Sequence, residues 1–192
     1  MKRDIILAGV GGQGILSIAT VIGAAALNEG LYLKQAAVHG MSQRGGDVQS
    51  NLRLSSEPIY SDLIPKGGAD IIISLEPMEA LRYLPYLKPD GWIVSSSKPF
   101  VNIPNYPDIE EVLAHIKRLP NHVLLDVEAL AKGAGAPAQA ANMVLLGAAI
   151  PMLGIDHDKI IDGVSRIFAR KGEAIVTTNI AAIEAGYNNS SK

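Results

Sequence analysis

The sequence predicts an α/β fold, with a doubly wound and mostly parallel sheet, an antiparallel hairpin and a C-terminal helical segment. Three observations support this class. Short apolar runs of strand length alternate with longer segments of helical periodicity. The chain opens with an apolar strand that leads into a glycine-rich turn and a helix. Residues 48–55 alternate between apolar and polar side chains, which is typical of a half-exposed strand.

The predicted elements follow one another along the whole chain. The expected strands are 4–10, 33–38, 48–55, 70–75, 92–95 and 123–126. The expected helices are 15–28, one beginning at 76–77, 109–119, a short one ending at 132, 138–153, one capped by Asp156, and 173–185. The length of 192 residues suits one core, and no internal repeat is visible. We therefore expect a single domain over residues 1–187 and a frayed tail over 188–192.

Two turns and one proline define where later elements are expected to end. Glu57-Pro58 predicts a turn after the third strand, with Ile59–Ser61 returning as a short antiparallel partner. Lys88–Gly91 reads Lys-Pro-Asp-Gly and predicts a second turn. Pro151 lies inside the helix expected at 138–153 and should kink or end it. Because that helix is almost wholly apolar, it should be buried centrally or covered by a partner.

The opening loop is the first candidate for a ligand site. Gly9, Gly11 and Gly14 match the spacing G-x-G-x-x-G of a Rossmann-like nucleotide-binding unit. There the first glycine permits a tight turn, the second lets a ligand approach the backbone, and the third lets helix and strand pack closely. Free amides at the helix start would favour an anion. A dinucleotide site also needs an acid after the second strand, where this chain has His39–Ser42, so NAD(P) binding is disfavoured.

The second candidate is the loop that follows the second strand, at the carboxyl edge of the sheet where such folds bind ligands. Its polar and glycine residues are His39, Ser42, Gln43, Arg44, Gly45 and Gly46. Arg44 offers a guanidinium fork to a carboxylate or phosphate. The alternative is a structured loop in which Arg44 pairs with Asp47 or with a neighbouring subunit. These residues are equally consistent with a contact to a small molecule and with a contact to another subunit.

Composition excludes several classes of function. The net charge of −2 argues against a nucleic-acid binder that works by general electrostatic attraction. The chain has no cysteine, so it has no disulfide, no cysteine-ligated zinc or iron–sulfur cluster and no thiol nucleophile. No apolar run is long enough to span a bilayer, and Asp4 comes too early for a signal peptide. We expect a soluble cytoplasmic protein.

No complete catalytic set is evident in the sequence. Ser42, His39 and Asp126 have the residue types of a hydrolytic triad, but the G-x-S-x-G elbow is absent. The remaining histidines are isolated and form no grouping with metal-site spacing: His115, His122 and His157. Asn142 and Asn179 lie in apolar helices, where they would cap backbone groups or bond across a subunit interface. A nucleotide-fold scaffold without a catalytic set favours a subunit of a larger enzyme.

Two motifs together carry a resemblance to a known family. Gly9–Ile15 reads GVGGQGI, and Val38–Gly46 reads VHGMSQRGG. The pair resembles the gamma-type module of the 2-oxoacid:ferredoxin oxidoreductases, and the HGMSQRGG form is similar, more narrowly, to the beta subunit of the indolepyruvate-type enzymes. Two further features fit the family: Asn142 followed by Leu146-Gly147-Ala148, and the pair of helices expected at the end of the chain. The resemblance therefore covers nearly the whole chain. Ser50–Arg53 departs from it, since a more basic or histidine-bearing strand is expected there.

The resemblance implies a role as a subunit without cofactors of its own. The complete enzymes oxidatively decarboxylate a 2-oxo acid, here an arylpyruvate such as indolepyruvate, to an acyl-CoA and pass electrons to ferredoxin. Thiamine diphosphate, magnesium and iron–sulfur clusters would belong to a cysteine-rich alpha subunit. This chain agrees, because it has neither cysteine nor a GDG…N segment for thiamine diphosphate. No nucleic-acid or membrane partner is expected.

The resemblance also suggests which residues meet the partner. The two loops would face the alpha subunit and help to enclose the entrance for CoA or substrate. The residues expected to contact a ligand or the partner are Gly9, Gly11, Gly12, Gln13, Gly14, His39, Ser42, Gln43, Arg44, Gly45 and Gly46. The alternatives from other classes are a free-standing NAD(P)-dependent oxidoreductase and a nucleotide-sensing module.

Overall fold

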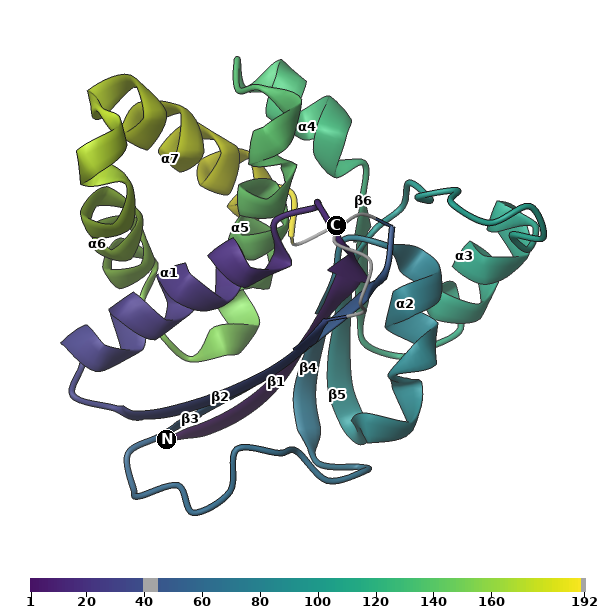
Figure 1. Cartoon of the computed structure of the whole chain (residues 1–192), viewed down its shortest axis with the longest axis horizontal. Coiled ribbons are helices and arrows are strands. Elements are labelled where there is room, and N and C mark those ends of the chain that lie inside the picture. The colour runs from purple at the N-terminus through teal and green to yellow at the C-terminus, as the bar shows by residue number, and fades with distance from the viewer. Residues whose placement is uncertain (40–44, 191–192) are drawn as a thin grey trace.

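A computed structural model describes residues 1–39 and 45–190. Within these residues, strands form a sheet in the order β2-β3-β1-β4-β5-β6 (Figure 1). The strands are β1 Lys2–Val10, β2 Tyr32–His39, β3 Asp47–Ser55, β4 Ala69–Ser74, β5 Leu87–Ser96 and β6 His122–Leu125. β1, β4, β5 and β6 run parallel, whereas β3 is antiparallel to both of its neighbours, β1 and β2. The predicted α/β class with its mostly parallel sheet and antiparallel hairpin is confirmed.

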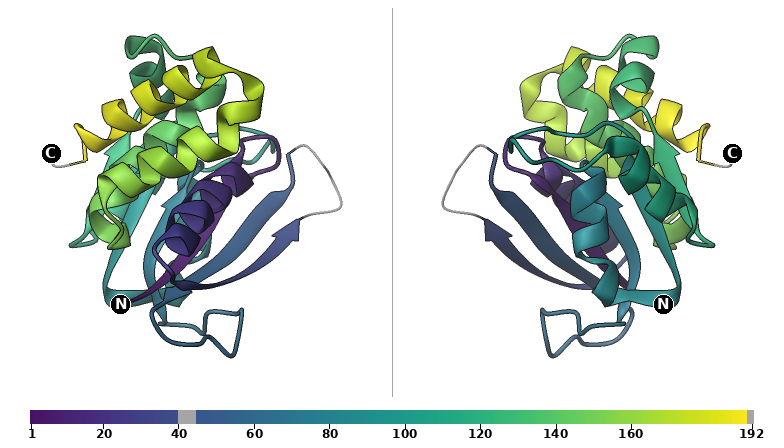
Figure 2. Two further views of the ribbon diagram at one scale, coloured as in Figure 1. Left: turned by 90° about the vertical axis from the view of Figure 1, so that its left-hand side faces the viewer. Right: turned by 90° about the vertical axis from the view of Figure 1, so that its right-hand side faces the viewer.

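Helices cover both faces of the sheet. Over the described ranges they are α1 Ile15–Asn28, α2 Pro77–Arg82, α3 Ile109–Lys117, α4 Val127–Gly133, α5 Ala141–Leu153, α6 His157–Phe168 and α7 Glu173–Tyr187, with 3₁₀ turns at 84–86, 138–140 and 169–171. α2 and α3 lie on one face, and the other helices lie on the opposite face (Figures 1 and 2). Successive side chains of β1 therefore enter different cores: Ile5 and Leu7 the larger, Ile6 and Ala8 the smaller.

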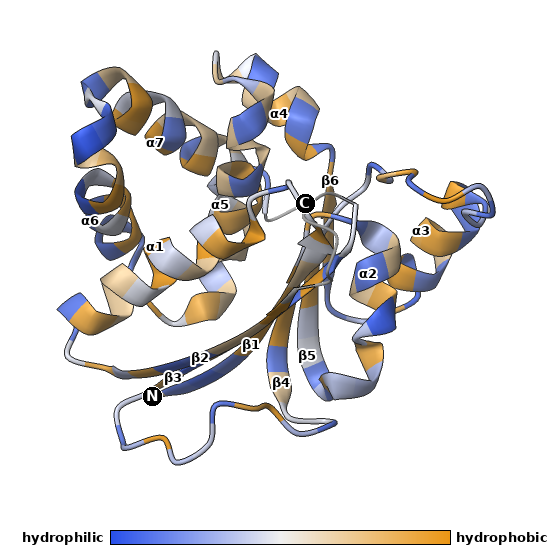
Figure 3. Ribbon diagram, in the orientation of Figure 1, coloured by the Kyte–Doolittle hydropathy of each residue, from blue (hydrophilic) through white to orange (hydrophobic). Residues whose placement is uncertain are grey.

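Hydropathy distinguishes helices that the fold covers from those that face solvent. α1 is mostly apolar, whereas α6 has a hydrophilic and a hydrophobic side (Figure 3). In α6 the buried positions are Ile160, Gly163 and Val164, which follow the helical spacing expected for one inward stripe. The sequence prediction of an amphipathic helix after Asp156 is confirmed.

The antiparallel partner of β3 differs from the sequence prediction. β3 pairs with β2 and β1, and residues 56–68 contain no strand, so the predicted return strand at Ile59–Ser61 is wrong. The guanidinium of Arg53 donates hydrogen bonds to the carbonyl oxygens of Ser61 and Leu63 at 3.1 and 3.0 Å. These carbonyl groups therefore accept hydrogen bonds from a side chain instead of from the backbone of a neighbouring strand.

The predicted turn at Lys88–Gly91 is also wrong, because these residues lie inside β5. The register between β4 and β5 shifts between the pairs Ala69–Leu87 and Ile71–Trp92. The extra residues form an irregular bulge. A proline lacks the amide hydrogen that a regular ladder needs, and the bulge accommodates it without breaking the sheet.

α5 is buried along almost its whole length, as its apolar sequence predicts. The helix continues two residues past Pro151 to Leu153, and Gly154 follows with φ of +72°. This left-handed conformation is a usual way to end a helix, and glycine adopts it without strain. Pro151 thus lies in the last turn.

The contact between α5 and α7 brings two backbones together. A Cβ atom added to Gly147 would lie 2.0 Å from the carbonyl oxygen of Ile183, and one added to Gly186 would lie 1.8 Å from that of Val144. Both distances are far below van der Waals contact. Glycine at these two positions is therefore what allows α7 to cross α5 so closely.

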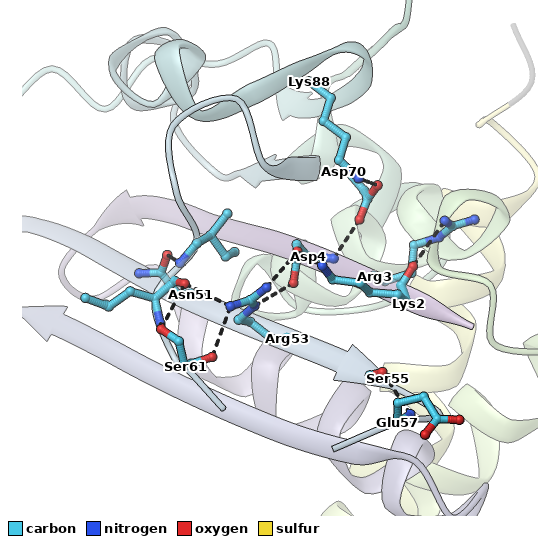
Figure 4. A network of polar contacts seen from close by, with 12 residues as sticks. Lys2, Arg3, Asp4, Asn51, Arg53, Ser55, Glu57, Ser61, Asp70 and Lys88 are labelled. Atoms are coloured by element: carbon cyan, nitrogen blue, oxygen red, sulfur yellow. Dashed lines mark hydrogen bonds and ion pairs between the residues drawn. The ribbon is translucent and has the colours of Figure 1, made fainter. Parts of the chain in front are cut away.

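A network of ion pairs and hydrogen bonds joins the amino ends of β1, β4 and β5 to the carboxyl end of β3 (Figure 4). Arg53 of β3 binds both carboxylate oxygens of Asp4 on β1, at 2.7 and 3.1 Å. The backbone amide of Asp4 donates to Asp70 on β4, which also pairs with Lys88 on β5. The side chain of Asp4 is only 3% exposed. This network holds residues 56–68 against the sheet through Arg53.

None of the helices described here is long and apolar enough to cross a membrane. At the end of α7, the amide of Ser190 donates to the carbonyl oxygen of Tyr187. The tail predicted over residues 188–192 includes residues 191 and 192, which lie outside the described residues.

Candidate functional site

The two candidate loops are joined at the carboxyl edge of the sheet. The amide of Gly11 donates to the carbonyl oxygen of Gly46 at 2.8 Å, and the amide of Gly45 donates to the carbonyl oxygen of Gly11 at 3.3 Å. In the motif, the second glycine lets a ligand approach the backbone, and a ligand or partner contact at Gly11 stays a prediction. Its donor and acceptor are both used within the chain, which further disfavours a dinucleotide pyrophosphate at this glycine.

Gln13 is an internal brace of the first loop. Its side-chain oxygen accepts from the amide of Val10 at 2.8 Å, and its side-chain nitrogen donates to the carbonyl oxygen of Leu75 at 3.1 Å. Val10 ends β1, and Leu75 directly follows β4. Gln13 therefore fixes the loop to the ends of two neighbouring strands.

The glycines of the first loop serve different steric needs. A Cβ atom on Gly9 would lie 2.8 Å from the side chain of Ile15, so the first glycine, rather than the third, allows α1 to pack on the strand. Gly12 has φ of +103° with open space around it, and Gly14 has φ of +78°. A Cβ atom on Gly14 would lie 2.6 Å from the amide nitrogen of Asn142. The predicted tight turn is confirmed. Gly9, the first glycine, allows the close packing expected of the third, and Gly14, the third, has the turn conformation expected of the first.

The second loop is described only in part. Ser42, Gln43 and Arg44 lie outside the described residues, so their roles stay predictions, as does the pairing of Arg44 with Asp47. The backbone of His39 ends β2. On the other side of the gap, the carbonyl oxygen of Gly45 accepts a hydrogen bond from the side chain of Asn102.

Two buried side chains, Glu79 and Tyr83, lie beside Asp47 at the end of the second loop. The hydroxyl of Tyr83 donates to the carboxylate of Asp47, at 2.9 Å from the nearer oxygen. Burial is the largest cause of the raised pKa of Glu79, which the ion pair with Arg82 opposes and the nearby carboxylate of Asp47 reinforces. Burial, followed by the hydrogen bond to Asp47, raises the pKa of Tyr83.

A second acid fixes the segment after β5. Glu76 is 2% exposed and accepts hydrogen bonds from the amide of Phe100 and the hydroxyl of Tyr106. Burial and this hydrogen bond raise the pKa of Tyr106. The side chain of Glu76 also caps α2 by accepting from the amide of Glu79. The carboxylate thus anchors residues 97–107 at the edge that carries the candidate loops.

A pocket of about 560 Å³ opens behind the first loop. Its floor is formed by Gly12–Gly14 and the ends of β4 and β5, and its walls by the starts of α1, α4 and α5 together with residues of α7. Sequence reasoning missed the two lysines and two phenylalanines that line it: Lys98, Lys171, Phe100 and Phe168. These four residues belong to no motif, whereas two other pocket residues outside the glycine loop, Asn142 and Asn179, were singled out from the sequence.

The other candidate residues have structural partners. The side-chain nitrogen of Asn142 donates to the carbonyl oxygen of Gly14 at 3.1 Å, and that of Asn179 to Ile175, so both cap backbone groups as the first interpretation predicted. Asp126 caps α4 and pairs with Lys98. Each remaining histidine bonds a nearby backbone oxygen or carboxylate. Over residues 1–39 and 45–190 no cluster of His, Cys, Asp and Glu could hold a metal ion.

These features define a nucleotide-type α/β domain whose glycine-rich loops are braced from within the chain. The chain belongs to the pyruvate ferredoxin/flavodoxin oxidoreductase family, whose model matches residues 4–189. It is 32% identical over 200 residues to the indolepyruvate oxidoreductase subunit IorB of Archaeoglobus fulgidus, with 98% of this chain and 95% of that protein covered. It is 40% identical over 155 residues to IorB of Pyrococcus horikoshii, covering 77% and 76%.

Solved structures share the fold. The gamma subunit of a keto/oxoacid ferredoxin oxidoreductase from Geobacter sulfurreducens aligns with a TM-score of 0.68 at 24% identity, over 98% of both chains. Pyruvate oxidoreductase subunit PORC from Thermotoga maritima gives 0.74 at 19% identity, over 98% of this chain and 96% of that one. A 2-oxoglutarate:ferredoxin oxidoreductase chain from Magnetococcus marinus gives 0.76 at 23% identity, and this chain spans only 31% of it.

Proposed function

We propose that this chain is the subunit without cofactors in a ferredoxin-dependent 2-oxoacid oxidoreductase of the indolepyruvate type. The complete complex oxidatively decarboxylates an arylpyruvate to an acyl-CoA in the cytoplasm. The observation that carries the proposal is the 32% identity to the Archaeoglobus fulgidus IorB subunit across 98% of this chain and 95% of that protein. The paired GVGGQGI and VHGMSQRGG motifs support the same assignment.

The residues of this chain do not fit the cofactors that the reaction requires. Iron–sulfur clusters are held by cysteine thiolates, and the chain has no cysteine. Magnesium bound with thiamine diphosphate requires oxygen ligands that converge, and over the described residues no group of three or more His, Cys, Asp and Glu side chains could hold a metal ion. We therefore assign thiamine diphosphate, magnesium and the clusters to a cysteine-rich alpha subunit, which also passes electrons to ferredoxin.

The contribution of this chain is then a shaped surface at the carboxyl edge of its sheet. The hydrogen bonds between Gly11 and Gly45-Gly46 join the two motif loops, and Glu76 fixes residues 97–107 beside them. We propose that this edge faces the alpha subunit and borders the entrance used by CoA or the 2-oxo acid. Arg44 would bind a carboxylate or phosphate there through its planar guanidinium.

Assembly is tested by expressing the chain with and without the alpha subunit. A tagged chain should retain a brown, cysteine-rich partner through size-exclusion chromatography. If the partner elutes separately at micromolar concentration, the proposal of a stable complex is wrong.

The role of the second loop is tested with Arg44→Ala in the assembled complex. The variant should weaken either the association of the subunits or the apparent affinity for CoA by about tenfold, a loss typical of a charge-assisted contact. Arg118→Ala is the matched control, because Arg118 is an exposed arginine that lies just after α3 and belongs to neither motif loop. Unchanged values for both quantities in Arg44→Ala would refute this role.

A further inference from the structure

The segment between β5 and α3 carries a dense group of exposed apolar side chains. Phe100, Val101 and Ile103 are 41%, 66% and 36% exposed. Over residues 1–39 and 45–190, no other four consecutive positions include three exposed large apolar side chains. Single exposed apolar residues are common on protein surfaces, whereas grouped ones typically mark a site of interaction. Residues 99–107, which we call the apolar strap, therefore indicate an interaction surface.

The composition of the apolar strap is typical of the centre of a protein interface. The strap reads Pro-Phe-Val-Asn-Ile-Pro-Asn-Tyr-Pro and carries no charged residue. Interface centres are depleted of charged residues and enriched in aromatic ones, and their rims are polar. Charged residues flank the strap at both ends: Lys98 pairs with Asp126, and Asp108 caps α3. An apolar centre with a polar rim is thus already present in the chain.

Hydrogen bonds hold the apolar strap in place, although its residues form neither helix nor strand. The buried carboxylate of Glu76 accepts from the amide of Phe100 at 3.5 Å and from the hydroxyl of Tyr106. The side chain of Asn102 donates to the carbonyl oxygen of Gly45. Three prolines restrict the backbone further. A surface that is ordered before binding loses less conformational entropy when a partner docks, and this favours affinity.

The position of the apolar strap indicates which partner covers it. The strap follows the carboxyl end of β5, at the edge of the sheet that also carries both motif loops (Figure 1). Asn102 bonds directly to Gly45 of the second loop, and Gly45 bonds to Gly11 of the first. The strap therefore continues the surface that we propose to face the alpha subunit, and one partner can cover all three segments.

We propose that the apolar strap is the hydrophobic anchor of the contact with the alpha subunit, with Phe100, Val101 and Ile103 buried in an uncharged apolar groove of that subunit. This inference rests on the proposed function and deepens it, because it names the side chains that supply most of the affinity and the chemistry of the partner surface. A few central apolar and aromatic side chains usually dominate the binding energy of an interface.

Isothermal titration calorimetry of the full chain into the purified alpha subunit tests the proposal. Val101→Asp should weaken the association by at least about thirtyfold, because it places a charge against an apolar groove. Val101→Ile keeps an apolar side chain and should retain the affinity. Leu63→Asp is the matched control: Leu63 is 59% exposed in the segment that leads into the amino end of β4, and its variant should bind like the unaltered chain. Thermal unfolding of the free Val101→Asp and Leu63→Asp variants should match that of the unaltered chain, since both side chains are largely exposed.

The outcomes separate this inference from the proposed function. Equal binding of Val101→Asp and the unaltered chain would overturn the role of the apolar strap and leave the proposed function standing. If the unaltered chain does not bind the alpha subunit at micromolar concentration, both are overturned. Self-association of the free chain that Val101→Asp abolishes, with its affinity for the alpha subunit unchanged, would assign the strap to a second copy and overturn the inference. Marked destabilisation of free Val101→Asp would assign Val101 to the core of the chain itself, with the same consequence.

Discussion

The side-chain nitrogen of Asn142, in the first turn of α5, donates a hydrogen bond to the carbonyl oxygen of Gly14 at the start of α1, 128 residues away in sequence. This hydrogen bond fixes the distance between the start of α1 and the start of α5. Both starts border the pocket and the loop that carries the first motif. The geometry of the candidate site thus depends on a hydrogen bond between a glycine and an asparagine that the sequence places far apart.

Gly14→Ala should destabilise the protein by about 2–3 kcal/mol, because the added Cβ combines backbone strain with a clash. Gly14 has φ of +78°, and the Cβ would lie 2.6 Å from Asn142. Gly30→Ala is the control, since Gly30 has φ of +71° with nothing within 4 Å, and it should cost about 1 kcal/mol. Urea unfolding measures both. Equal losses in the two variants would show that the contact with Asn142 has no energetic weight.

Gly186→Ala should destabilise the protein by about 3 kcal/mol or more, because α7 must move away from α5 to admit the methyl group. The new Cβ would lie 1.8 Å from the carbonyl oxygen of Val144. Gly133→Ala in α4 has open space and should be neutral or slightly stabilising. Thermal unfolding of the two variants checks the difference, and a tolerated Gly186→Ala contradicts the close crossing.

Asp4→Asn should cost about 3–5 kcal/mol, because it leaves the buried charge of Arg53 without its partner. The side chains of Asp4 and Arg53 are 3% and 12% exposed. The exposed pair of Lys159 and Glu29 is the comparison, and Lys159→Ala should leave stability nearly unchanged. Chemical unfolding at low and high salt should show Asp4→Asn as the larger loss under both conditions. Similar losses in both variants would mean that burial does not set the strength of the Asp4–Arg53 pair.

Glu79 should make stability fall as pH rises above its ordinary pKa of 4.5. Burial raises its pKa in the folded state, so between the two pKa values the folded chain binds more protons than the unfolded chain. The contribution of this group is therefore lost as pH increases through the folded pKa. Glu79→Gln should remove that decline in a series of urea unfolding curves. A carboxyl titration by NMR with its midpoint at or below 4.5 would contradict the prediction.

Sequence patterns predicted those parts of the fold that depend on local periodicity. The order of strands and helices, the buried α5 and the tight turn at the glycine loop all follow from residue spacing. The errors arose where contacts with other parts of the fold override a local turn signal. Glu57-Pro58 reads as a hairpin turn, but Arg53 takes the carbonyl groups of the following segment. The sequence of Lys88–Gly91 is typical of a turn, but in the structure these residues belong to a bulge within β5.

The candidate site could be predicted only in outline. Motif spacing identified the two loops, and the structure joins them through Gly11, Gly45 and Gly46. Motif spacing did not reveal that Gly11 and Gln13 form hydrogen bonds within the chain, because both sets of contacts depend on where other strands end. Lys98 and Lys171 reach the pocket from segments 73 positions apart, and no local pattern marks either of them.

Reduction of ferredoxin by indolepyruvate and CoA, measured with the purified chain alone and again after addition of the alpha subunit, tests the central claim most directly. We predict no turnover by the chain alone and ferredoxin reduction at an ordinary enzymatic rate in the complex, with both substrates required. Turnover of indolepyruvate, or of any small-molecule redox substrate, by the pure chain without another protein would contradict the account.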